Sequence, residues 1–150
     1  MFKNILLAYD GSENARKALN VAIDLALKYN AKLYIVEVVD TNSISVSDLR
    51  GASSLDINRV IEEIKTKASG DIRECIKLAQ SSNVEADGEV LEGDPASEIL
   101  RYCEEIKADL IVTGCRGMSR WKRLLIGSVS SRIVSESKVP TLVVKATTSI

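Results

Sequence analysis

The chain contains no histidine, and this absence removes several kinds of chemistry at once. Hydrolases of the Ser-His-Asp and Cys-His types need an imidazole base, and many zinc sites need imidazole ligands. Cysteine is scarce as well: Cys75, Cys103 and Cys115 are odd in number, far apart and without a CxxC pair. We therefore expect neither a disulfide framework nor a zinc site, and we expect Cys75 and Cys103 to be small buried core residues.

The sequence also lacks a long apolar run and an excess of charge. No apolar stretch approaches the roughly 18 residues of a membrane helix, and the first residues lack the regions of a signal peptide. Twenty basic residues against 21 acidic ones leave a net charge of −1, which does not favour nucleic acid or an anionic membrane as a partner. We expect one cytoplasmic domain over residues 1–150, with no nucleic-acid or membrane partner.

Short apolar runs alternate with amphipathic stretches along the chain. This pattern predicts strands at residues 2–9, 32–39, 84–91, 109–113 and 140–145, and helices at 12–30, 55–82, 94–106 and 127–137. Ser12 and Asp94 are the expected N-caps, and Gly70 is the expected place of a bend or break in the long second helix. Strands that alternate with helices predict a single-domain, Rossmann-like α/β fold with an open parallel sheet and helices on both faces.

The loop after the fourth expected strand carries a pattern of glycines. It begins Gly114-Cys115-Arg116-Gly117 and ends Gly127-Ser128, which gives G-x2-G-x9-G-S. In open parallel sheets, ligands bind beyond the carboxyl ends of the strands, so this loop is well placed. Gly127-Ser128 opens a helix, and the free N–H groups and partial positive charge of a helix start suit a phosphate. The hydroxyls of Ser128 and Ser130 add donors. The structural alternative is a turn, a loop glycine and a helix cap.

Two other residues of these loops have two interpretations each. Asp10, at the end of the first expected strand, is either a turn or cap residue or a carboxylate near a ribose or metal ion. Arg116, between two glycines of the pattern, is either a solvated loop residue or a phosphate contact. The Walker A pattern and a GxGxxG after the first strand are both absent, which disfavours those two kinds of nucleotide site.

Three further segments carry family features: ILLAYDGSENARKAL near the start, DLIVTGCRGMSRWKRLLIGSVSSRIV after the third helix, and VPTLVVK near the end. With these segments and the glycine pattern, the sequence resembles the universal stress protein family over its whole length, in its ATP-binding branch. The resemblance implies five parallel strands in the order 3-2-1-4-5. It places the switch in strand order between the first and fourth strands, where Asp10 and Gly114 lie.

By motif position, the resemblance also implies a set of nucleotide-binding residues. They are Gly117, Gly127, Ser128 and Ser130 for the phosphates, Gly114 and Asp10 near the ribose, the backbone of Val38 for the adenine, and Val129 chiefly through its main chain. Two positions depart from the family pattern. Cys115 stands where serine is usual, which puts a side-chain contact there in doubt but leaves the backbone N–H, because a thiol is a weak donor. Glu37 stands where histidine is frequent, and this change should not affect a contact with adenine that the backbone makes.

The resemblance further implies the ligand, the assembly and the function. The ligand is ATP, with Mg²⁺ or Mn²⁺ carried by its phosphates rather than by a protein cage. The assembly is a homodimer formed through the last strand, Thr141–Lys145, since an apolar edge favours pairing. The expected function is an ATP-binding, stress-response regulatory module with little or no catalysis. Two alternatives stay open: a slow ATPase or phosphotransferase that uses the same pocket, and a partner-binding scaffold with a vestigial site.

Overall fold

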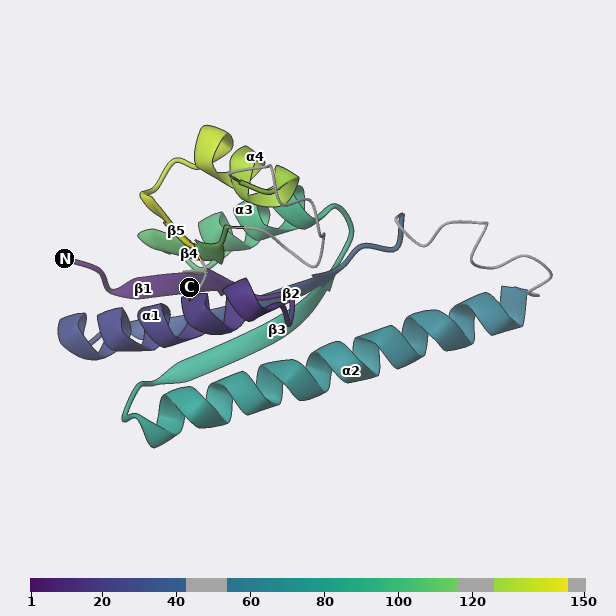
Figure 1. Ribbon diagram of the computed structural model, residues 1–150, viewed down its shortest axis with the longest axis horizontal. Coiled ribbons are helices and arrows are strands. Elements are labelled where there is room, and N and C mark those ends of the chain that lie inside the picture. The colour runs from purple at the N-terminus through teal and green to yellow at the C-terminus, as the bar shows by residue number, and fades with distance from the viewer. Residues whose placement is uncertain (43–53, 116–125, 146–150) are drawn as a thin grey trace, which may run out of the picture.

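Strands and helices alternate along the chain in the computed structural model, which describes residues 1–42, 54–115 and 126–145 (Figure 1). The strands are β1 (Asn4–Ala8), β2 (Lys32–Val39), β3 (Ala86–Glu92), β4 (Leu110–Gly114) and β5 (Thr141–Val144). The helices are α1 (Glu13–Tyr29), α2 (Ser54–Ser81), α3 (Pro95–Glu105) and α4 (Ser128–Glu136). Each expected element is present, with bounds shifted by at most two residues.

The five strands form one parallel sheet in the order β3-β2-β1-β4-β5, which confirms the order that the resemblance implied. The chain leaves β1 toward β2 on one side and reaches β4 on the other, so the switch in strand order lies between β1 and β4. Strand β1 lies in the middle of the sheet, and its residues Ile5, Leu6 and Leu7 are fully buried. A strand that is covered on both faces has a nearly continuous run of apolar residues, and this run made β1 recognisable in the sequence.

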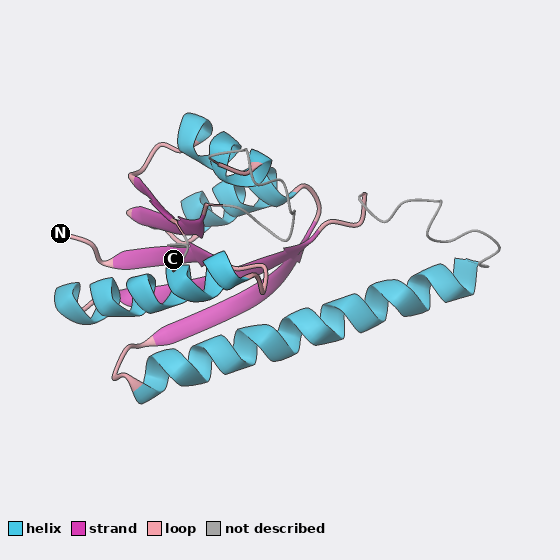
Figure 2. Ribbon diagram, in the orientation of Figure 1, coloured by secondary structure: helices cyan, strands magenta, loops and turns pink. Residues whose placement is uncertain are grey.

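Helices cover both faces of the sheet (Figure 2). Alternate side chains of a strand point to opposite faces, so Leu7 packs with residues of α1 and α2, whereas Leu6 packs with residues of α3 and α4. Ile72 and Ile133 are among the core residues that α2 and α4 contribute to these two layers. Cys75 and Cys103 are buried, one in each layer, as the sequence predicted.

The starts of α1 and α3 agree with the capping residues that the sequence suggested. Ser12 caps α1 by accepting the N–H of Ala15 at 3.1 Å. Asp94 caps α3 by accepting the N–H of Ser97 at 3.0 Å, and a proline follows at the first helical position. A side-chain oxygen at this position satisfies an N–H that the helix itself leaves without an acceptor, which fixes where each helix begins.

The expected break at Gly70 is wrong, because α2 runs without interruption through its 28 residues. Ala68 and Ile72, on either side of Gly70, are both buried, and this packing outweighs the low helix propensity of glycine. A different glycine sets the position of α2: a Cβ atom at Gly88 of β3 would lie 2.6 Å from Cγ2 of Ile72. Neither α2 nor any other helix in the described ranges is both long and apolar enough to cross a membrane.

Candidate functional site

The carboxyl ends of the central strands bring two of the predicted site residues to one edge of the sheet. The register places Ala8, the last residue of β1, beside Val36 of β2 and beside Thr113 of β4. Asp10 lies two residues beyond Ala8, in the loop after β1, and Val38 lies two residues beyond Val36, within β2. This edge lies at the switch in strand order, where open parallel sheets bind their ligands.

Gly114 ends β4 in a position that has no room for a side chain. A Cβ atom there would lie 2.9 Å from Cβ of Asn14 and 3.2 Å from the backbone nitrogen of Ala15. Both neighbours belong to the first turn of α1, so α1 begins directly against the end of β4. This close approach explains the glycine by packing, while its place near a ribose stays a prediction.

The start of α4 differs from those of α1 and α3 because, among the described residues, no side chain caps it. Its N-cap is Gly127, whose own N–H donates to the carbonyl of Cys115 at 2.7 Å. The first bond of the helix runs from the N–H of Ser131 to the carbonyl of Gly127, at 2.9 Å. The N–H groups of residues 128–130 precede that bond, and the helix has no acceptor for them. Together with the helix dipole, they form a site suited to an anion.

Ser130 has a structural role that the sequence did not suggest. Its side chain is buried, and its hydroxyl lies 2.6 Å from the carbonyl oxygen of Gly114, to which it donates. The hydroxyl of Thr113 lies 3.3 Å from the same Ser130 oxygen. The start of α4 is thereby fastened to the end of β4. Ser128, by contrast, is exposed.

Asp10 is exposed and takes part in a turn. Its Oδ1 atom accepts the N–H of Ser12 at 2.9 Å, and Gly11 between them has a φ angle of +81° that favours glycine. The turn interpretation of Asp10 is therefore confirmed. The second carboxylate oxygen is not used by this bond, and its contact with a ribose or metal ion stays a prediction.

Three predicted nucleotide contacts belong to the end of β4 and the loop that follows it. Arg116 and Gly117 lie outside the described residues, as does the rest of 116–125. Cys115 is described: its side chain is buried, and its N–H donates to the carbonyl of Val144 at 2.8 Å. That amide therefore continues the pairing of β4 with β5, and a nucleotide contact from Cys115 stays a prediction.

A pair of carboxyl groups near Asp10 was not predictable from any pattern in the sequence. Glu37 of β2 lies close enough to Asp71 of α2 for the two carboxyl groups to interact electrostatically. Burial, and after it the nearby charge of Asp71, raises the pKa of Glu37 to about 7 against the opposing effect of Lys67. Among the described residues, Oε2 of Glu37 is buried without a hydrogen-bond partner. The pair joins positions 34 apart, so only the fold brings it together.

The chemistry of this edge suits a phosphorylated ligand better than a metal ion. Among the residues that the structure describes, no group of three or more Cys, Asp and Glu side chains could hold a metal. The described groups at the start of α4 are backbone N–H donors and the Ser128 hydroxyl, and together they suit phosphate oxygens. A divalent ion that accompanies a nucleotide would find its ligands on the phosphates, which is how Mg²⁺ commonly enters such sites.

Comparison with known proteins gives consistent results at the levels of sequence and fold. The model of the universal stress protein family matches residues 1–145. Universal stress protein MJ0531 of Methanocaldococcus jannaschii is 34% identical over 97% of this chain and 83% of its own length.

Solved structures share the architecture. The hypothetical protein MJ0577 has a TM-score of 0.88 at 26% identity, with 99% of both chains covered. A universal stress protein in complex with cAMP has a TM-score of 0.70 at 24% identity, covering 95% of this chain and 97% of its own.

Proposed function

Because this chain belongs to the universal stress protein family, we propose that it binds an adenine nucleotide, ATP in particular, at the carboxyl edge of its sheet. The single observation that carries the proposal is the start of α4, where the N–H groups of residues 128–130 have no acceptor within the helix. The cAMP found in a protein of the same fold supports the choice of an adenine nucleotide.

In this proposal the nucleotide lies across the switch between β1 and β4. The phosphates sit at the start of α4, on the backbone of Gly127 and residues 128–130 and on the Ser128 hydroxyl. The ribose lies near Asp10 and Gly114, and the adenine meets the backbone of Val38. Arg116 and Gly117 complete the phosphate site. Mg²⁺ or Mn²⁺ is carried by the phosphates.

We further propose that the protein acts as a cytoplasmic stress-response regulator with little or no catalysis. The chain has no histidine to serve as a base, and Ser130, the buried hydroxyl at the site, already donates to Gly114. Binding therefore changes the state of the protein rather than the nucleotide. A phosphate-release assay with ATP and Mg²⁺ tests this point, and fast turnover would contradict it.

The proposed assembly is a homodimer through β5. This strand lies at the end of the strand order, and Leu142 on it is 37% exposed. An edge strand with exposed apolar side chains favours pairing with a second chain. Native mass spectrometry should give twice the mass of 16.3 kDa for the wild type and the single mass for Leu142→Asp. A monomeric wild type would contradict the dimer and leave the nucleotide site unaffected.

The nucleotide site is tested by removing one N–H group without disturbing the helix. Proline is well tolerated at the first position of a helix, and Gly127 has φ −71° and ψ 162°, which suits a residue before proline. Ser128→Pro removes both the N–H and the hydroxyl, whereas Ser128→Ala removes the hydroxyl alone. A charge-assisted hydrogen bond contributes about 1.5–3 kcal/mol, so Ser128→Pro should weaken ATP binding by roughly tenfold to a hundredfold.

Thermal unfolding with ATP, AMP and cAMP provides the measurement, because a ligand at 100 times its dissociation constant stabilises the native state by about 2.7 kcal/mol. We expect Ser128→Ala to retain most of the ATP-induced shift and Ser128→Pro to lose most of it. Equal shifts in the wild type and in Ser128→Pro would overturn the proposed site. Absence of any shift in the wild type would overturn nucleotide binding itself.

A further inference from the structure

Helix α4 has few contacts with which to hold its position. It is nine residues long, and its buried residues are Ser130 and Ile133. Ile133 packs in the layer shared with α3, and Ser130 bonds to the end of β4. Together with the half-buried Val129, which packs against the same layer, these residues hold the side of the helix that faces the sheet, and a contact outside this layer would fix its direction further.

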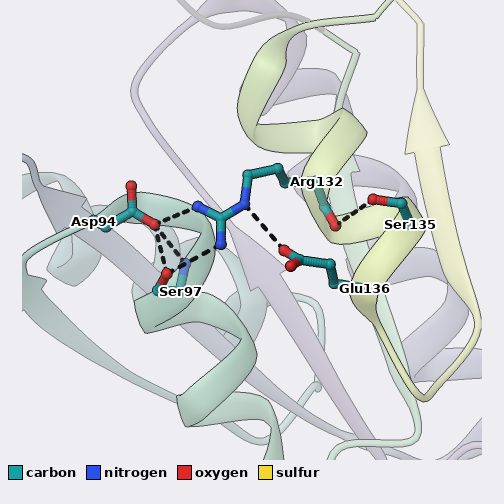
Figure 3. Close-up of polar contacts among 5 residues, drawn as sticks. All are labelled: Asp94, Ser97, Arg132, Ser135 and Glu136. Carbon is teal, nitrogen blue, oxygen red and sulfur yellow. Dashed lines mark hydrogen bonds and ion pairs between the residues drawn. The ribbon is translucent and has the colours of Figure 1, made fainter.

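Arg132 supplies such a contact across to α3 (Figure 3). Its Nη1 atom lies 2.7 Å from Oδ2 of Asp94, and its Nη2 donates to the hydroxyl of Ser97 at 3.2 Å. Its Nε donates to Glu136, one turn along α4, at 3.0 Å. The guanidinium is a rigid, planar fork, so three bonds made at once fix its orientation as well as its position.

The partner of Arg132 is itself held firmly. Asp94 also accepts from the N–H and the hydroxyl of Ser97, at 3.0 and 2.6 Å. These bonds and the Arg132 guanidinium lower the pKa of Asp94 to about 2, so the carboxylate is charged at neutral pH. The preceding residue, Gly93, donates its N–H to the carbonyl of Val39 at 3.1 Å. Arg132 therefore connects α4 to a point anchored on the end of β2.

We propose that Arg132 is a positioning residue, which fixes the direction of α4 so that its first N–H groups meet the phosphates of the bound nucleotide. Arg132 follows Ser128 by four residues, which places the two side chains on the same face of the helix, one turn apart. The inference rests on the proposed function, since it concerns the geometry of the same phosphate site. Arg132 touches no phosphate itself and acts through the backbone of residues 128–130.

Arg101 offers a matched control. It lies on α3, its side chain is 52% exposed against 46% for Arg132, and it also forms two ion pairs with carboxylates. Both of its partners, Glu98 and Glu105, belong to its own helix. Arg101→Met and Arg132→Met thus remove the same charge and the same number of ion pairs, but only the second removes a bond between helices.

The experiment measures dissociation constants for ATP by calorimetry and for adenosine by ligand-observed NMR, which detects weak binding. For Arg132→Met we expect ATP to bind about tenfold more weakly, the size of effect typical of groups that orient direct ligands, and adenosine to change by less than about twofold. Arg101→Met should leave both constants unchanged. Arg132→Lys, which restores a charge but not the fork, should recover part of the ATP affinity.

Three results would overturn the inference, and they are distinguishable. Equal ATP affinities for Arg132→Met and Arg101→Met would remove the positioning role and leave the nucleotide site intact. Equal losses for ATP and adenosine in Arg132→Met would show a general loosening of the fold rather than a displaced phosphate site. A wild type that binds no ATP would remove the proposed function and this inference together.

Discussion

The starts of α3 and α4 lie on the same face of the sheet, but they differ in whether a side chain accepts hydrogen bonds from their first N–H groups. At α3, Asp94 accepts the N–H of Ser97, and a proline at the first position has no N–H to satisfy. At α4, Gly127 has no side chain to offer, and no side chain in the described part of the protein caps the first N–H groups. The first N–H groups of a helix thus stabilise the fold when neighbouring residues accept their hydrogen bonds, and they can bind a ligand when no residue does.

The largest expected effect comes from giving α4 the cap that α3 has. Gly127→Asp places a carboxylate where the phosphates are proposed to bind, so it competes for the same N–H groups and repels the nucleotide. We expect ATP affinity to fall about a hundredfold or more, since several charge-assisted bonds are lost. Stability should rise by a few tenths of a kcal/mol, because aspartate is a better N-cap than glycine.

Calorimetry and urea unfolding check this pair of effects, which have opposite signs. Loss of binding through partial unfolding would lower both quantities, so that result cannot imitate the expected one. If Gly127→Asp binds ATP as the wild type does, the open start of α4 is not the phosphate site.

Glu37 is a second place where a polar group of the described residues lacks a partner, because its buried Oε2 atom has no hydrogen bond. Its pKa is raised from 4.5 to about 7, so the native state holds the proton more tightly than the unfolded chain does. The stabilisation is complete below the ordinary pKa of a glutamate and is lost as the pH rises through about 7. Because Glu37 is half-buried, we expect the loss between pH 5 and 8 to be on the order of 1–2 kcal/mol rather than the full shift.

Urea unfolding across that pH range measures the slope, and Glu37→Gln is the matched variant because it is uncharged at every pH. The absence of histidine keeps this window free of the usual contributors. The wild type should lose stability as the pH rises, whereas the variant should stay nearly level. Parallel curves would show that Glu37 is ionised in the native state at neutral pH.

Removal of the side-chain cap of α3 should have a smaller effect, on stability. Asp94→Ala removes the cap of α3, and loss of a cap should lower the midpoint of thermal unfolding by roughly 2–6 °C. Asp94→Asn should lower it less, because asparagine caps a helix about as well and keeps an acceptor for Arg132. Scanning calorimetry of both variants gives the comparison. Equal losses would mean that the charge, and not the cap, is what stabilises α3.

Much of the fold could be predicted because its signals are local. Ser12, Asp94 and Gly127 lie within a few residues of the N–H groups that they cap or leave open, so their roles are visible in the sequence. The contacts that were missed join distant positions: Arg132 meets Asp94 across 38 residues, and Glu37 meets Asp71 across two elements. Even at Gly114 the glycine was visible, but its reason, the approach of Asn14, depends on packing.

The most direct measurement follows the backbone N–H signals of both helix starts while ATP is added to ¹⁵N-labelled protein. We predict that the signals of Ser128, Val129 and Ser130 shift most, whereas those of Ala96 and Ser97 at the closed start of α3 shift far less. If ATP binds while the three signals of α4 stay in place, the uncapped start of this helix does not hold the phosphates.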